Sequence, residues 1–292
     1  MTFKSKMLYS NSTNRRYHLL VGITVDKYKG LNPASIIKLT RKIGLKFIEI
    51  TKSVFDDLPS VLEELGHIKT GFHLPNYGDN GYDFTCLDRE DESDRLIELI
   101  NKNHKSLNVQ YCLSHPPECP AEEKSRDELD SILFDKLNKL ETPVIIENVQ
   151  GLSVQQFSEF YKKAEQALKS KLIGQCFDAP HYYVRGDDPV AILRNHNGPL
   201  QCVHLSDCRS GRDSHLPFDS GGELPIPEIL EILKERNYDN FINLELLPRS
   251  ASDIGAVIKS YLTILKTFNR LDYYRTKFRL LIYAPVLKRK IK

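Results

Sequence analysis

The 292-residue sequence lacks features that would assign it to several common classes of protein. No apolar run reaches the roughly 18–20 residues of a membrane-spanning helix, so we expect no membrane partner. Residues 1–16 form a polar leader without the apolar segment of a signal peptide. The turn after the first apolar stretch, GITVDKYKG, does not match the GxGxxG pattern, which argues against a dinucleotide-binding doubly wound sheet.

Excess charge and paired cysteine motifs are also absent. Lysine and arginine number 41 against 39 acidic residues, and this near-neutral balance argues against a protein whose whole surface binds nucleic acid. The six cysteines form no CxxC pair, and a chain of this length does not need disulfide bonds to be stable. We therefore expect reduced cysteines and a cytoplasmic protein.

The sequence does contain a regular alternation of strand-like and helix-like segments. Short apolar, β-branched runs are followed by stretches with helical apolar spacing and helix signals such as Asn32-Pro33 and Gly44. The expected strands are Tyr17–Val25, Phe47–Thr51, Ile68–Leu74, Val109–Ser114, Val144–Val149, Leu172–Phe177, Leu200–Leu205 and Phe241–Leu247. This series predicts an α/β fold, a single (β/α)8 TIM barrel over residues 17–270. Residues 271–292 form a C-terminal appendage, helical or irregular, with a basic tail.

Residues of metal-ligand type occur at the ends of six consecutive expected strands. Active sites of (β/α)8 barrels lie at this end of the strands, so the side chains should converge. Imidazole and carboxylate are the usual ligands of zinc, and carboxylate-rich mixtures also suit manganese or magnesium. Each residue alone has a structural explanation, but the repeated pattern favours a shared cation, because unpaired buried carboxylates are costly. The candidates are His73, His115, Glu147, Asp178, His181, His204, Asp213, His215 and Glu245.

The alternation of side chains along a strand gives a second expectation. Residues two positions before the candidate ligands should face the barrel interior one layer below them. These residues are Gly71, Leu113, Ile145, Cys176, Cys202 and Asn243. All suit a packed interior except Asn243, which needs a polar partner.

Six motifs carry a resemblance to a known superfamily. They are HLPNYG around His73, SHPP around His115, IENVQG around Glu147, FDAPH around Asp178 and His181, the single motif HLSD…DSHLPF from His204 to Phe218, and INLELLP around Glu245. Over residues 17–268 the chain resembles the xylose isomerase-like TIM barrels. That superfamily includes sugar and sugar-phosphate isomerases and epimerases, and also endonuclease IV.

The resemblance to the isomerases and epimerases implies a divalent metal, zinc, manganese or cobalt. Its implied ligands are Glu147, Asp178, His204 and Glu245. Glu147 and Glu245 would also move a proton between adjacent carbons of a small sugar or sugar phosphate. The implied substrate-binding residues are His73, His181, Arg209 and Arg212.

The resemblance to endonuclease IV implies that all nine candidates hold up to three zinc ions and cleave DNA at an abasic site. The loops LPNYGDNGYDF and PPECPAEE are acidic or neutral, whereas an enzyme that grips DNA needs cations there. Arg185, Arg209, Arg212 and Arg249 suit a sugar phosphate or a DNA backbone equally. We therefore expect the sugar enzyme first and the abasic-site endonuclease as the alternative. A non-enzymatic barrel is disfavoured because both acid–base candidates are present.

The apolar residues of Leu271–Leu287 suit covering either the barrel or a second copy in a homo-oligomer.

Overall fold

Eight parallel strands close into a barrel in this computed structural model, which describes residues 19–28, 31–120, 124–247 and 253–290. Around the barrel the strand order is β1-β10-β7-β6-β5-β4-β3-β2. The strands are β1 (Leu20–Val25), β2 (Phe47–Ile50), β3 (Lys69–His73), β4 (Val109–Ser114), β5 (Val144–Glu147), β6 (Leu172–Asp178), β7 (Leu200–Leu205) and β10 (Phe241–Leu244). The predicted (β/α)8 barrel is confirmed. The leader 1–16 and Arg249 lie outside the described residues.

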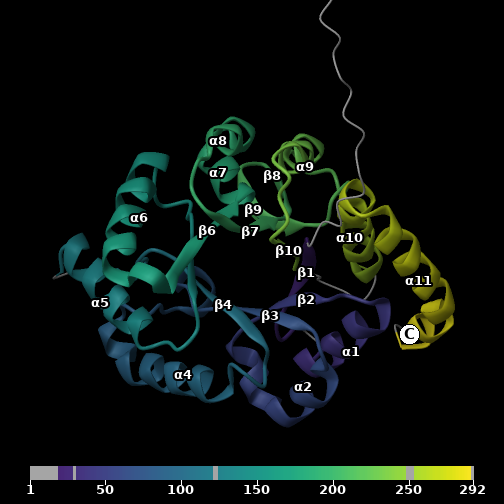
Figure 1. Ribbon diagram of the computed structural model, residues 1–292, viewed down its shortest axis with the longest axis horizontal. Coiled ribbons are helices and arrows are strands. Elements are labelled where there is room, and N and C mark those ends of the chain that lie inside the picture. The colour runs from purple at the N-terminus through teal and green to yellow at the C-terminus, as the bar shows by residue number, and fades with distance from the viewer. Residues whose placement is uncertain (1–18, 29–30, 121–123, 248–252, 291–292) are drawn as a thin grey trace, which may run out of the picture.

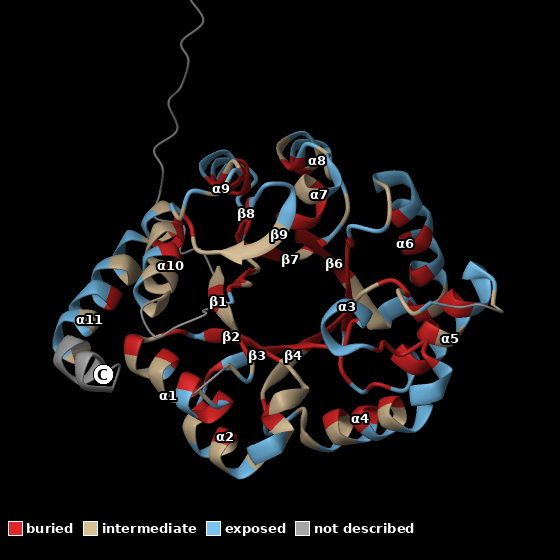
Figure 2. Ribbon diagram, turned by 180° about the vertical axis from the view of Figure 1, so that it is seen from behind, coloured by how far each residue is buried: buried red, intermediate tan, exposed pale blue. Residues whose placement is uncertain are grey.

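Helices surround the barrel, and most of them turn their apolar faces towards it (Figures 1 and 2). They are α1 (Pro33–Ile43), α2 (Leu58–Leu65), α3 (Tyr77–Asn80), α4 (Glu90–Asn103), α5 (Arg126–Asn138), α6 (Val154–Leu168), α7 (Ala179–Arg185), α8 (Pro189–Asn195), α9 (Ile226–Glu235), α10 (Ile254–Phe268) and α11 (Arg270–Lys290). Local signals set several ends: the Asn32 side chain caps α1, and Gly44 ends it with a left-handed backbone. Every helix in the described part of the chain is too short or too polar to span a membrane.

The structure differs from the expected elements mainly at the mouth of the barrel. The expected loop after β7 is an antiparallel hairpin of β8 (Asp207–Arg209) and β9 (Arg212–Leu216). Helix α7 follows β6 directly, because the Asp178 side chain accepts a hydrogen bond from the backbone N–H of His181 and caps the helix. Strand β10 ends at Leu244, so Glu245 lies just beyond the strand.

The barrel interior below the candidate ligands is packed as expected. Leu113, Ile145, Cys176 and Cys202 form one buried cluster with Phe47 and Tyr111. Gly71 leaves room for the Tyr111 ring, since a β-carbon at position 71 would lie 2.5 Å from it. The amide of Asn243 finds its polar partners in Thr24, at 2.9 Å, and Glu49, at 3.2 Å.

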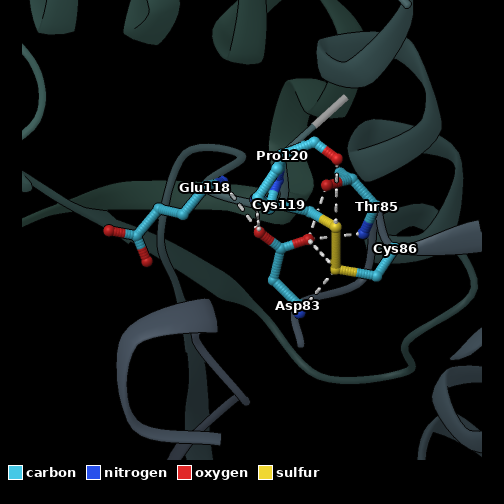
Figure 3. The surroundings of a disulfide bond; sticks show 6 residues. All are labelled: Asp83, Thr85, Cys86, Glu118, Cys119 and Pro120. Atoms are coloured by element: carbon cyan, nitrogen blue, oxygen red, sulfur yellow. Dashed lines mark hydrogen bonds between the residues drawn. A yellow bond between two sulfur atoms is a disulfide. The ribbon is translucent and has the colours of Figure 1, made fainter. Parts of the chain in front are cut away.

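The cysteine expectation is wrong for two of the six residues. Cys86 and Cys119 form a disulfide bond, whereas Cys112, Cys176, Cys202 and Cys208 are free and buried. The bond joins the loop after β3 to the loop after β4, beside the buried Asp83 (Figure 3). One carboxylate oxygen of Asp83 accepts from the backbone N–H groups of Glu118 and Cys119 at 2.7 and 2.8 Å, so it joins the same two loops. The pairing escapes a sequence motif because the cysteines are 33 residues apart and only the barrel places their loops side by side.

Removing this disulfide should destabilise the protein. The bond closes a loop of 33 residues, and the entropy lost by the unfolded chain predicts that Cys86→Ser with Cys119→Ser lowers the free energy of unfolding by about 2–4 kcal/mol. Urea unfolding followed by circular dichroism measures the change. Dithiothreitol should shift the wild type to the midpoint of the double variant and leave the variant unchanged. A wild type that already unfolds like the variant without reductant would show that the bond does not form.

Candidate metal centre

All nine candidate ligands gather at the carboxyl ends of the barrel strands. His73, Glu147 and Asp178 are the last residues of β3, β5 and β6, and His204 lies in β7. The others are His115 and Glu245, just after β4 and β10, His181 in the first turn of α7, and Asp213 and His215 in β9. The hairpin folds its two candidates back over the strand ends, which explains how residues beyond β7 reach the same centre.

Glu147 lies at the middle of the cluster and is fully buried. Its Oε2 atom lies 3.5 Å from Nε2 of His115, 3.8 Å from Nε2 of His73 and 3.3 Å from Nδ1 of His204. Its Oε1 atom lies 3.4 Å from Nδ1 of His181. One carboxylate thus contacts four imidazoles from four different elements.

The candidates fall into three groups of neighbouring donor atoms. His73, His115 and Glu147 form the first, and Glu147, Asp178, His204 and Glu245 form the second, with all donor atoms of each group within 4.8 Å of one another. In a third group, Oδ2 of Asp213 lies 3.3 Å from Nε2 of His181 and 3.6 Å from Nε2 of His215. Glu147 belongs to the first and second groups and touches His181 of the third.

Hydrogen bonds outside the cluster orient the imidazoles. The Nδ1 atoms of His73, His181 and His215 lie 2.8–3.1 Å from the backbone carbonyl oxygens of Leu74, Asn148 and Glu245. For His115 the corresponding partner is the carboxylate of Glu118, at 3.3 Å from Nδ1. Each contact favours a proton on Nδ1 and leaves the Nε2 lone pair free, an arrangement typical of histidines that bind metal.

Several buried donor atoms have no hydrogen-bond partner in the described structure. Four of them belong to the candidate ligands: both carboxylate oxygens of Glu147, Nε2 of His115 and Oδ1 of Asp213. Buried polar atoms without partners are rare in proteins because each one loses its hydration without compensation. A divalent cation would satisfy these atoms, so the residues present fit a metal ion.

The electrostatics of the cluster lead to the same inference. Burial opposes the charge on Glu147, yet His204 and His115 hold the pKa of its carboxyl well below the usual range. Burial likewise opposes the charge on His115, but Glu147 and Glu118 raise the pKa of its imidazole to about 10. Burial raises the pKa of Asp178 to about 8, and neighbouring Glu147 adds to the rise. Positive charge at the imidazoles thus stabilises the buried carboxylates, and a bound cation would supply this charge in place of protons.

Glu49 is a further residue of this centre, and the sequence analysis missed it. It lies in β2, is fully buried, and places one carboxylate oxygen 3.2 Å from Nε2 of His204. It also accepts hydrogen bonds from Tyr111 at 3.0 Å and from Asn243 at 3.2 Å. Glu49 thereby directs Nδ1 of His204 towards Glu147 and Glu245. A carboxylate in the middle of the apolar run FIEIT was the available signal.

Two of the three described arginines at this face are engaged with the protein itself. Arg209 donates to the backbone carbonyl oxygens of Ser220 and Gly221, and Arg185 pairs with Asp187 at 2.9 Å. Arg212 is the first residue of β9, and its side chain is exposed. Binding of substrate by Arg209 and Arg212 stays a prediction.

A cavity opens directly beside the cluster. His73, His215 and Glu245 line it together with polar residues from β1, α3 and the segments next to them: Thr24, Asp26, Thr51, Lys52, Asn76, Asp79 and Asn80. The ammonium group of Lys52 is held by Glu92 at 3.2 Å and by the Tyr82 hydroxyl at 3.3 Å. The polar part of the lining therefore offers mainly hydroxyl, amide and carboxylate groups, and Tyr28, Pro75, Leu246 and Leu247 supply the rest.

The structure is thus a closed (β/α)8 barrel whose mouth gathers imidazoles and carboxylates that could hold a metal ion. The chain belongs to the xylose isomerase-like TIM barrel family, whose model matches residues 37–267. This confirms the superfamily indicated by the six sequence motifs.

Individual relatives are more distant. The chain is 26% identical over 152 residues to an inosose dehydratase of Clostridium beijerinckii, a match that covers 44% of this chain and 51% of the relative. The chain thus spans about half the length of this curated relative. A D-tagatose 3-epimerase-like protein shares the fold at a TM-score of 0.61 and 18% identity, covering 94% of this chain and all of that one. An AP endonuclease, family 2, of Brucella melitensis shares the fold at a TM-score of 0.58 and 13% sequence identity, and the match covers 80% of this chain and 93% of that one. At sequence identities this low, the structural similarity shows a shared fold and no more.

Proposed function

We propose that the protein is a divalent-metal-dependent isomerase or epimerase of a small sugar. The observation that carries the proposal is the lining of the cavity beside Glu245. Hydroxyl, amide and carboxylate groups suit the hydroxyls of a neutral sugar, and Asp26, Asp79 and Glu245 would repel a phosphate. The names of two similar proteins, an inosose dehydratase and a D-tagatose 3-epimerase-like protein, are consistent with this substrate class.

Glu147 and Glu245 are the proposed acid–base pair. Both approach Nδ1 of His204, at 3.3 and 3.2 Å, so both contact the same point of the cluster. Glu245 also lines the cavity and would take the proton from a substrate carbon there. In an isomerase, Glu245 would deliver that same proton to the adjacent carbon. In an epimerase, Glu147 would deliver a proton taken up from water to the opposite face of the same carbon, and Glu245 would release its proton to water. When bound, a divalent cation held by Glu147, Asp178, His204 and Glu245 supplies Lewis-acid polarisation of substrate oxygens. His73 and His181 hold substrate hydroxyls through hydrogen bonds.

The grouping of the nine ligands favours a second candidate, hydrolysis of a phosphodiester. Three donor groups connected through Glu147 suit more than one metal ion, and multinuclear centres are common in phosphodiester hydrolysis. The cavity lining and the engaged arginines argue against DNA, because a DNA-binding face needs free cations for phosphates.

Incorporation of solvent deuterium tests the proposal. Manganese-loaded protein is incubated with a panel of neutral ketoses and aldoses in D2O, with Glu245→Gln as the control. The proposal expects deuterium at a carbon next to the carbonyl and an epimer or isomer as product, both lost in the variant. Nicking of abasic-site duplex DNA above the level of the same variant, with no exchange in any sugar, would establish the nuclease instead.

A further inference from the structure

The outward face of helix α11 carries an apolar stripe. Leu271, Tyr274, Phe278, Leu281 and Ile282 are each between 55% and 74% exposed. Their spacing of three or four residues, with Ile282 adjoining Leu281, places them on one side of the helix. Among the described residues, most of the large exposed apolar side chains lie on this helix. Exposure of this kind on a single face indicates a surface that another partner covers.

Contacts on the opposite face of α11 fix its orientation. Thr276 is buried, and Tyr273 and Leu280 pack against the core. Asp272 forms an ion pair with Lys46 at 3.0 Å. The helix packs against α1 and α10 and forms the outer edge of the molecule (Figures 1 and 2). The stripe therefore faces away from the barrel and cannot close onto it without breaking these contacts.

Positive charge borders the stripe on both sides. Arg270 and Lys277 lie along one edge, and Arg275 and Arg279 along the other, as the helical repeat of 3.6 residues dictates. All four are exposed. Asp272 is the single acidic residue of the helix sequence, and Lys46 and Arg275 already engage it.

This charge distribution selects the kind of partner. Pairing two copies through the stripe would bring two sets of four cations together, so the charges oppose a dimer there. An apolar stripe bordered by lysine and arginine instead complements a surface with an apolar interior and anionic groups at its edge.

We propose that α11 docks this protein onto an anionic lipid surface. The helix lies in the plane of the membrane, with the stripe in the boundary between headgroups and acyl chains and the flanking cations beside lipid phosphates. The expectation of no membrane partner was based on the absence of a spanning segment, which does not bear on a helix lying flat. The inference is independent of the reaction at the barrel mouth.

Co-sedimentation of the full chain with vesicles tests the inference. Vesicles of phosphatidylcholine alone are compared with vesicles that also contain phosphatidylglycerol. The partition coefficient of the wild type should be at least about tenfold higher for the anionic vesicles than for the neutral ones. Phe278→Asp with Leu281→Asp, and separately Arg275→Glu with Lys277→Glu, should each lower that partition by about tenfold.

Matched controls come from helix α6. Val154 and Lys162 are exposed there, so Val154→Asp and Lys162→Glu replace an apolar and a basic residue on another surface and should leave binding unchanged. Circular dichroism verifies that each variant is folded. Absence of wild-type binding to anionic vesicles, or equal binding by wild type and folded α11 variants, would overturn the proposal. A wild-type dimer that Phe278→Asp with Leu281→Asp dissociates would also overturn it and assign the stripe to a second copy.

Discussion

Glu147→Gln is expected to lower turnover by about 10²–10⁴-fold, whether the substrate is a sugar or a phosphodiester. The carboxylate contacts His73, His115 and His204 through one oxygen and His181 through the other. An amide of the same shape removes the negative charge and turns one acceptor into an N–H donor that faces these imidazoles. Two of the three donor groups lose a shared ligand at once.

The loss is measured as kcat with the substrate identified by deuterium exchange, alongside metal content by mass spectrometry. Glu98→Gln on the exposed face of α4 is the matched control, because it makes the same chemical change away from the cluster. Full activity in Glu147→Gln would refute the acid–base pair and the multinuclear centre together.

Glu49→Gln is expected to weaken metal binding by about 10–100-fold, although Glu49 is not assigned as a ligand. Its carboxylate accepts hydrogen bonds from Tyr111 and Asn243 and lies within reach of Nε2 of His204. Glutamine offers a single acceptor oxygen to these three groups and places its own N–H donors among them. His204 then loses the contact that directs Nδ1 towards the cluster.

Isothermal titration calorimetry with manganese or zinc measures the change in metal affinity. Tyr111→Phe is the control, because it removes one hydrogen bond to Glu49 and leaves the carboxylate in place. It should weaken binding less than Glu49→Gln. Unchanged metal affinity in a folded Glu49→Gln protein would show that Glu49 serves packing alone.

Much of the candidate centre could be predicted because the pattern that marks each of its residues lies in the residues next to it in the sequence. Glu147 and Asp178 end apolar runs of strand length, and a parallel barrel brings all such ends to one rim. Strand alternation likewise predicted the interior positions of Cys176 and Cys202. The roles assigned to these residues in metal binding and catalysis stay predictions.

Other features depended on contacts between distant segments. Glu49 and His204 are 155 residues apart, and Glu49 was overlooked because it lies within a strand instead of at its end. Asp213 and His215 reach the cluster only because β8 and β9 form a hairpin over the strand ends. The arginines could be counted in the sequence, but their engagement by backbone carbonyls and Asp187 could not.

The sequence by itself determined the barrel, the ligand types and the rim on which they lie, because strand period, helix capping and the ends of apolar runs are properties of neighbouring residues. Tertiary structure decided which imidazole nitrogen faces the cluster, that Cys86 and Cys119 pair, and that one face of α11 is left uncovered. These features arise when segments far apart in the chain come within a few ångströms of each other. No local pattern encodes such distances.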